Sequence, residues 1–413
     1  KSLMPIDVMA KASAEFWENA DSNYTYLQYG PAIGALDYLD ELAKFLSAEY
    51  STNISVDCLA LTSGASQSFS NILSLFTTAE TKIIVEDPTY FLALQVLQDH
   101  GFACNKFINV PTDSNGLDVD YLEYALTKNY SQKNTNSHND AKKFDYLLYF
   151  VPIFSNPTGH TTNLQRLEKL LVLARTFNIL VVCDDIYPLL LYDESTPTPP
   201  RLITLDHAAN CQSLTTTSVN TSFGNVISNN SFSKILSPGL RIGWIEASPH
   251  LIAHLSRSGL MNSGGAANHI VSGLVVTCIR QGGLHTHLDK LRRVYAARMQ
   301  ALCDYLDAHL PACVRVDRPK GGFFVWITIP EGHNTLEILN ACNSSGNVAD
   351  VRNHILYRDR RLTIQKMSFA PGNYFTTTTQ FTNCLRLSFA FYETDALLVG
   401  AQRLCQVLKE AVL

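Results

Sequence analysis

The chain has 413 residues, a formal net charge of −5 at pH 7 and a hydrophobic fraction of 46%. This length allows one large domain and a smaller one. The slightly acidic balance lacks the basic surface that binding to nucleic acid or to an anionic membrane requires, and no apolar run reaches the length of a membrane span, since the best candidate, residues 170–183, is interrupted by Arg175 and Asn178.

Ten cysteines are scattered along the chain without a Cys-x-x-Cys pair, so neither a zinc ribbon nor a redox pair is expected. Free thiols suit a reducing compartment, which predicts a cytoplasmic protein. His285 and His287 have no third ligand at a suitable spacing, so we expect no metal and interpret both as surface residues at a helix start. The chain begins at Lys1 without a methionine, so the lack of a signal peptide carries little weight.

The first part of the chain predicts two helices and a phosphate-binding turn. Apolar spacing predicts helices over 5–20 and 36–50, separated by the turn-rich segment 28–34. An apolar strand over 59–64 ends in Ser-Gly, and a helix over 65–76 follows. Strand, glycine and helix start together suit a phosphate, because the first N–H groups of a helix are unpaired. By itself this signal is weak, since Ser-Gly turns are common.

Two predicted strands then bring polar residues to their carboxyl ends. A strand over 82–85 precedes Pro88 and Tyr90, a tyrosine that could equally be packed beneath a loop. Residues 129–142 are polar and low in complexity, which predicts a surface insertion without chemistry. The buried strand 146–150 leads to Asn156-Pro157-Thr158-Gly159, a turn by composition. This puts Asn156 where α/β folds bind ligands.

A helix over 164–177 and a strand over 179–183 complete a βαβ unit. This strand ends in Asp184-Asp185-Ile186-Tyr187, and Asp184 follows Asn156 by 28 positions (184 minus 156). The residue types alone leave open which aspartate is functional, or whether the acidic pair only caps a loop. Residues 206–230 are rich in Ser, Thr and Asn, and we interpret them as an inserted loop near the mouth of a site.

One lysine lies among small hydroxyl residues in the segment 231–244. Lys234 follows Ser231 and Ser233, has no nearby acid, and precedes a Pro-Gly turn and Arg241. This arrangement suits an imine between the lysine and an aldehyde cofactor that carries a phosphate. The two serine hydroxyls and the planar fork of Arg241 would hold that phosphate. A surface lysine in a Ser-rich loop is the alternative.

The C-terminal part predicts a smaller domain. Helices are expected over 268–279 and 284–310, followed by strands over 321–326 and 383–391. The last strand holds Arg386 between Leu385 and Leu387. An arginine in an apolar strand is costly unless it is paired, so Arg386 meets either a carboxylate of the protein or an anionic ligand.

The order of these motifs resembles that of fold-type I pyridoxal phosphate (PLP) enzymes, the aspartate aminotransferase superfamily. Within it, the closest resemblance is to the aminotransferases of the 2-aminoadipate and valine type. The resemblance extends from Tyr29 to Arg386 and implies an α/β fold. This fold is a three-layer sandwich with a mainly parallel sheet, plus a smaller α+β domain. The large domain would span 36–285, and the small domain would combine 1–35 with 286–413.

The resemblance also implies a role for each candidate residue. Lys234 would carry the cofactor, and Asp184, selected over Asp185 by the Asp-x-x-Tyr pattern, would face its ring nitrogen; with Tyr187 these are the predicted catalytic residues. Arg386 and Asn156 would bind the substrate, with Arg386 on its α-carboxylate. The implied cofactor contacts are phosphate binding by Ala65, Ser66, Ser231, Ser233 and Arg241, ring stacking by Tyr90, bonds from Asn156 and Tyr187 to the phenolic oxygen, and a phosphate contact from Tyr29 of the other subunit of a homodimer.

The implied activity is ping-pong transfer of an amino group between an L-amino acid and a 2-oxo acid. Another PLP-dependent reaction, such as decarboxylation, β- or γ-replacement or oxidation, would use the same residues. A non-catalytic PLP-binding sensor would need a basic helix-turn-helix segment, which the chain lacks. The chain also departs from the family pattern: 50 positions separate Asp184 from Lys234 (234 minus 184), and no Gly-x-Pro segment precedes Leu3. Side-chain specificity is not predicted.

Overall fold

The computed structural model describes residues 3–130, 144–192, 196–213, 224–343 and 368–413. The predicted surface insertion at 129–142 therefore lies outside the described residues, apart from Asn129 and Tyr130, which end helix α6 (Val119–Tyr130). No helix of the described part is both long and apolar enough to cross a membrane.

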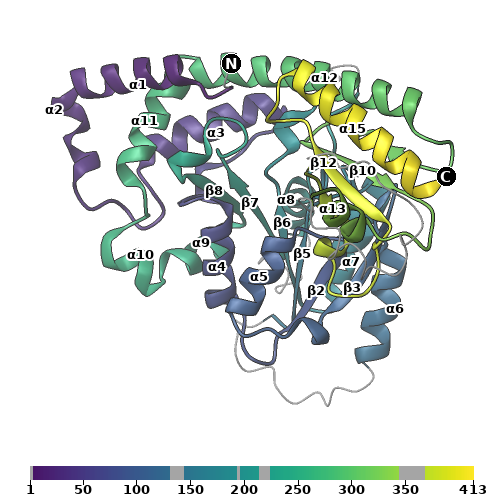
Figure 1. Cartoon of the computed structure of the whole chain (residues 1–413). Helices are drawn as coiled ribbons and strands as arrows, with labels where there is room; N and C mark the ends of the chain where they lie inside the picture. Colours follow the sequence, from purple (N-terminus) through teal and green to yellow (C-terminus); the bar gives the residue numbers. More distant parts are fainter. Residues whose placement is uncertain (1–2, 131–143, 193–195, 214–223, 344–367) are drawn as a thin grey trace.

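A large sheet forms the centre of the molecule (Figure 1). Strands β7, β6, β5, β2 and β3 pair in parallel, whereas β8 runs antiparallel to β7 and β1, and β4 runs antiparallel to β3. The sheet is therefore mainly parallel, as predicted. In spatial order its strands are β1 (Leu59–Thr62), β8 (Gly243–Ala247), β7 (Val226–Ser231), β6 (Ile179–Asp184), β5 (Tyr146–Phe150), β2 (Lys82–Asp87), β3 (Ile108–Asp113) and β4 (Gly116–Leu117).

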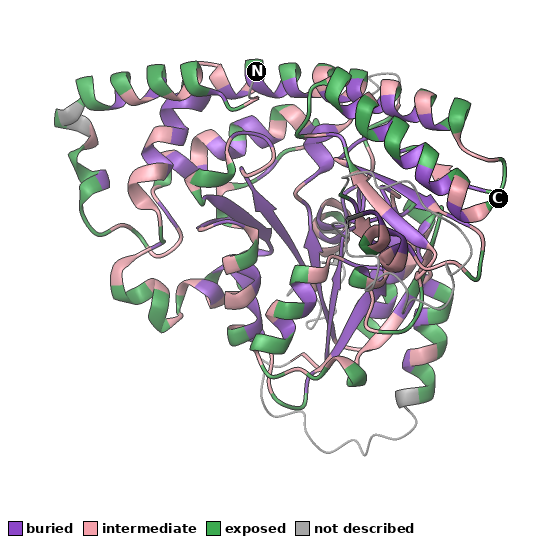
Figure 2. Ribbon diagram, in the orientation of Figure 1, coloured by how far each residue is buried: buried purple, intermediate pink, exposed green. Residues whose placement is uncertain are grey.

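Helices cover both faces of this sheet because its central strands are apolar on both sides. In β5, Tyr146, Leu148 and Phe150 enter one hydrophobic cluster, while Leu147 and Tyr149 enter the other. Figure 2 shows the strands buried between the layers. One layer contains α6, α7 (Leu164–Thr176) and α8 (Leu202–Ser213), and the other contains α3 (Leu36–Tyr50), α4 (Ala65–Phe76) and α5 (Phe91–Asp99). The predicted three-layer sandwich is confirmed.

A second, smaller sheet is entirely antiparallel. The long helix α12 (Gly283–His309) leads into it, and α15 (Thr394–Val412) packs along α12 (Figure 1). This confirms the predicted α+β unit. Its strands are β11 (Ala370–Pro371), β12 (Cys384–Ser388), β10 (Phe324–Thr328) and β9 (Arg315–Asp317), with helix α13 (Thr335–Asn343).

At the other end of the molecule, helix α1 (Ile6–Glu18) packs on α11 (His269–Arg280). The short helices α2 (Ala20–Asn23) and α10 (Gly259–Gly264) and the 3₁₀ turn η1 (Tyr24–Leu27) lie at this end, and α9 (Pro249–Ser256) contacts α10 (Figure 1).

Two sequence-based interpretations are wrong. Residues 206–230 are not one inserted loop, because α8 continues to Ser213 and β7 begins at Val226. The polar side chains of β7 are tolerated in the sheet because they are hydrogen-bonded; Asn230 Nδ2, for example, donates to the carbonyl of Ser228 at 3.0 Å. His287 is not a surface residue, since it is only 4% exposed on the buried side of α12.

Candidate active site

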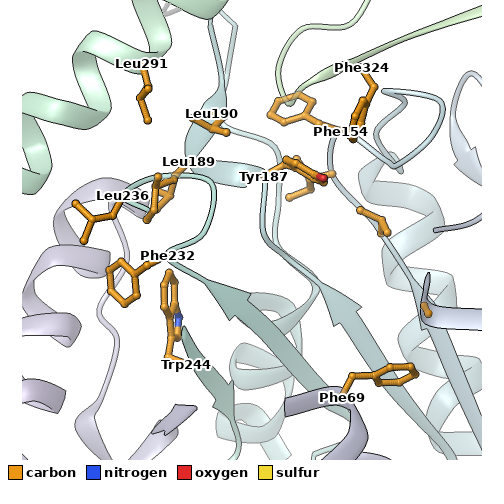
Figure 3. Close-up of a cluster of buried hydrophobic side chains, with 14 of the residues drawn as sticks. Phe69, Phe154, Tyr187, Leu189, Leu190, Phe232, Leu236, Trp244, Leu291 and Phe324 are labelled. Carbon is orange, nitrogen blue, oxygen red and sulfur yellow. The ribbon is translucent and has the colours of Figure 1, made fainter. Parts of the chain in front are cut away.

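The turn that carries Lys234 is held by its apolar neighbours. Phe232, Ile235 and Leu236 are at most 2% exposed. The Phe232 ring lies 4.9 Å from that of Trp244 on β8, and Figure 3 shows both rings with Leu236 in one buried cluster. With these side chains anchored below, Lys234 is left to face a cavity of about 190 Å³.

This cavity brings together most of the predicted cofactor-binding residues. Those that line it are Ala65, Ser66, Tyr90, Asp184, Ser231, Ser233, Lys234 and Arg241. They come from the ends of β6 and β7, the starts of α4 and α5, and the turn before β8. Pyridoxal phosphate would therefore meet a lysine, a carboxylate and an arginine in one cavity.

Asp184 at the end of β6 is the carboxylate of this cavity. It is 5% exposed, and its Oδ2 accepts a hydrogen bond of 2.6 Å from the hydroxyl of Tyr149, whereas its Oδ1 has no partner. Burial raises the pKa of Asp184 to about 6, against the lowering effects of the Tyr149 bond and the Lys234 charge. A buried carboxylate oxygen without a donor suits the protonated nitrogen of a pyridine ring.

Asp185, the neighbouring acid, does not point into the cavity. Asp185 is 3% exposed and accepts a 2.5 Å hydrogen bond from the hydroxyl of Ser228. It does not line the cavity. Successive side chains at the end of a strand point to opposite faces, so only Asp184 faces Lys234.

Lys234 lies in surroundings that favour its neutral amine. Burial is the main cause that lowers its pKa, and the charges of Arg386 and Arg241 act in the same direction, while Asp184 opposes them. Its Nζ lies 5.5 Å from the centre of the Phe323 ring. A lysine with a lowered pKa is a better nucleophile and proton acceptor near neutral pH.

The phosphate end of the cavity is built from backbone, hydroxyl and guanidinium groups. Helix α4 begins after Gly64, whose φ of 91° suits glycine, and has neither a side-chain cap nor an acid in its first turn. A Cβ at Gly64 would lie 3.3 Å from Nη2 of Arg241 and 3.6 Å from Oγ of Ser231. The free N–H groups of α4 and these polar groups therefore surround one space that suits an anion.

The predicted substrate-binding residues adjoin the cavity without lining it. Arg386 on β12 donates from Nη1 to Oδ1 of Asn156 at 2.6 Å, and its Nε has no partner. Its guanidinium lies 4.0 Å from the centre of the Phe324 ring. Burial lowers the pKa of Arg386 to about 10, and among the described residues no carboxylate pairs with it. The guanidinium is thus available to an anionic ligand.

Tyr187 and Tyr29 lie in opposite environments. Tyr187 is 2% exposed, hydrogen-bonds with Asn156 and packs in the aromatic cluster with Phe324 shown in Figure 3. Tyr29 is 87% exposed and does not line this chain's cavity. The structure therefore brings Tyr187 to the site but leaves Tyr29 on the surface near Gly264.

Sequence reasoning missed several residues that line the cavity, among them Tyr149, Ile186 and Asn229. A signal for Tyr149 was present, because a tyrosine in a buried strand needs a partner for its hydroxyl. Asn229 was hidden because the composition of its strand is that of a loop. Across the part of the chain that the structure describes, no three His, Cys, Asp or Glu residues gather as a metal site.

Comparison with protein-family models shows to which family this chain belongs. The model described as aminotransferase class I and II matches residues 1–404. The chain belongs to this family.

Individual relatives agree with this assignment. The aromatic-amino-acid aminotransferase 1 of Thermococcus litoralis is 28% identical, with 98% of this chain and 85% of that protein covered. The multiple substrate aminotransferase of Thermococcus profundus has a TM-score of 0.79 and 27% identity, covering 99% of this chain and 89% of that one. The α-aminoadipate aminotransferase LysN of Thermus thermophilus, complexed with N-(5'-phosphopyridoxyl)-L-leucine, has a TM-score of 0.76 and 26% identity, covering 98% and 89%.

The aminotransferase is thus a PLP-dependent enzyme that transfers amino groups, and the predictions of fold, cofactor and reaction are confirmed. The family assignment favours amino transfer over the other PLP-dependent reactions and over a non-catalytic sensor.

Proposed function

We propose that this aminotransferase carries its cofactor on Lys234, with Asp184 at the ring nitrogen and Arg386 at the substrate carboxylate. The observation that carries this proposal is that Lys234 and Asp184 face one cavity, where Asp184 Oδ1 lacks a partner. When bound, pyridoxal phosphate supplies an aldehyde that condenses with amines and a ring that withdraws electrons from the substrate α-carbon.

The other residues of the site bind the cofactor, and Lys234 also transfers a proton. Ser231, Ser233, Arg241 and the first N–H groups of α4 hold the phosphate. Asn156 and Tyr187 hold the phenolic oxygen, and Tyr90 stacks on the ring. The neutral amine of Lys234 would take the proton from the substrate α-carbon, and the ammonium so formed would act as the acid that gives the proton up again. The lowered pKa of Lys234 supports this proton transfer near neutral pH.

We further propose that amino donors with aromatic side chains are accepted. The substrate end is rich in rings: Arg386 lies on Phe324 and 4.9 Å from the centre of the Phe375 ring, and Phe323 lies beside Lys234. The name of the Thermococcus litoralis relative points to the same class. A screen of amino acids against 2-oxoglutarate, followed by the release of the donor's oxo acid, should give a higher kcat/KM for phenylalanine and tyrosine than for aspartate. The opposite order would refute this substrate class.

Replacing Arg386 by methionine should raise KM for amino donors by about two orders of magnitude, because removing one partner of a buried charge pair typically costs about 3 kcal/mol. Initial rates over a range of donor concentrations would measure the effect. Arg386→Lys keeps the charge but loses the planar fork, so it should recover only part of the affinity. An unchanged KM in Arg386→Met would rule out the carboxylate contact.

We also propose that the enzyme is a homodimer in which Tyr29 reaches the phosphate of the partner's site. Large apolar side chains are exposed on α1, η1 and α10 and at the start of α3, elements at one end of the molecule (Figure 1), as expected of a surface that a second copy covers. The exposed fractions are 49% for Trp17, 61% for Tyr24, 63% for Leu27, 67% for Leu36 and 62% for Leu260.

Replacing Leu27 by glutamate should dissociate this dimer, because a charge at a desolvated interface is unpaired, and should weaken cofactor binding with it. Light scattering would measure the mass. Val172→Glu is the matched control, since Val172 on α7 is also 63% exposed; it should leave the mass unchanged. A monomeric wild-type enzyme with full activity would contradict the proposal.

The division into a large domain (36–285) and a small one (1–35 with 286–413) and a cytoplasmic location complete the proposal. The large and small sheets support the division. The cysteines whose side chains the structure describes are free, which supports a reducing compartment.

A further inference from the structure

Asn229 is a buried side chain in the cavity that the proposed catalytic roles leave unexplained. It lies on β7 directly opposite Asp184 in the sheet register, and it is 1% exposed. Its Nδ2 donates a 2.9 Å hydrogen bond to the carbonyl of Ala65, 164 positions away in the sequence. Its Oδ1 has no partner, and the residue lines the cavity.

This hydrogen bond joins the two ends of the site. Ala65 is the first residue of α4, whose N–H groups face the phosphate space, while Asp184 marks the ring end. One turn further along α4, the Phe69 ring lies 4.8 Å from that of Tyr149, which in turn donates to Asp184. Helix α4 is therefore held to β7 and β5, the two strands that flank Asp184 on β6.

The choice of an amide has a physical reason. An amide N–H can bind the Ala65 carbonyl without adding a charge beside Asp184. A lysine or an acid at position 229 would shift the pKa of Asp184, because charges on paired residues of neighbouring buried strands interact strongly.

We propose that Asn229 is a positioning residue that sets the distance between the phosphate-binding turn and the ring-binding carboxylate. This inference rests on the proposed cofactor site at Lys234 and Asp184. It assigns no chemical step to Asn229. Loss of the hydrogen bond between Asn229 and Ala65 should weaken the binding of a ligand that contacts both ends of the site. It should have little effect on the binding of a ligand that contacts only the ring end.

The test compares pyridoxal phosphate with pyridoxal, which lacks the phosphate. In Asn229→Ala and in the similarly sized Asn229→Leu, dissociation constants measured by absorbance titration should rise about fivefold to tenfold for pyridoxal phosphate, as for loss of one buried hydrogen bond. They should rise less than about twofold for pyridoxal. Asn230→Ala is the matched control, because Asn230 is equally buried on the same strand but bonds only within β7; it should leave both constants near wild type.

Equal weakening of both ligands, wild-type affinity in both Asn229 variants, or the same selective loss in Asn230→Ala would overturn the inference. Thermal unfolding of each variant without cofactor would identify any that fails to fold, in which case the other Asn229 variant decides. If the wild-type enzyme itself forms no bond to the cofactor at Lys234, the proposed function fails instead, which separates the two outcomes.

Discussion

Replacing Lys234 by alanine is expected to lower kcat by more than about 1,000-fold, since the variant loses both the amine that binds the cofactor and the group that moves the proton. Stopped-flow absorbance with an amino donor would measure the rate. Borohydride reduction followed by peptide mapping should label Lys234 in the wild type and no lysine in the variant.

A small primary amine added to Lys234→Ala should restore part of the rate, because it can act as the missing base. Lys44→Ala is the control: Lys44 is a surface residue paired with Glu41 at 3.2 Å, and its loss should leave kcat unchanged. A pyridoxyl label on another side chain of the wild type would refute the assignment of Lys234.

Replacing Asp184 by asparagine is expected to lower kcat by about 100- to 1,000-fold, the typical cost of removing one charge that acts on the reacting group. The same change should stabilise the cofactor-free protein at neutral pH. The pKa of Asp184 is raised from 3.8 to about 6 in the folded chain, so the contribution of Asp184 to wild-type stability is fully present below pH 4 and is lost as the pH rises through 6.

The ionisation of Asp184 lowers the free energy of unfolding of the cofactor-free wild type by an amount on the order of 3 kcal/mol. The Asp184→Asn variant avoids this loss, because its amide side chain is neutral at all these pH values. Urea unfolding of the cofactor-free proteins should therefore show a stability difference in favour of Asp184→Asn that grows between pH 4 and 6 and is constant above. A difference independent of pH would mean that Asp184 is not the group that titrates, while an unchanged kcat would exclude its role at the ring nitrogen.

Much of the site could be predicted because each candidate residue follows a strongly patterned element. Asp184 comes at the end of a continuous apolar strand and Asn156 follows another by a few residues, and the carboxyl ends of parallel strands meet at one edge of a sheet. Lys234 is set among small hydroxyl residues and followed by a Pro-Gly turn. These patterns are local, so spacing and residue type placed the candidate residues at strand ends and turns, while their individual roles came from the resemblance to PLP enzymes.

The errors arose where local composition and tertiary environment disagree. The Ser- and Asn-rich residues of β7 have the composition of a loop, yet their side chains find hydrogen-bond partners inside the sheet, such as Ala65 for Asn229. The sequence around His287 predicts a surface position, whereas packing turns this face of α12 inward. In both cases partners distant in the sequence decided the outcome.

The amino-acid sequence by itself determined the strands that lead to Asn156 and Asp184 and the turn that carries Lys234, because hydrophobic period and turn chemistry act over a few neighbouring residues. The residue types alone left open which aspartate is functional, and it is Asp184, the one selected by the Asp-x-x-Tyr pattern, that lines the cavity with Lys234. Only the tertiary structure decided that Arg386 meets Asn156 and that Asn229 holds helix α4. These contacts join residues far apart in the chain, and their geometry exists only once the strands and helices have packed together.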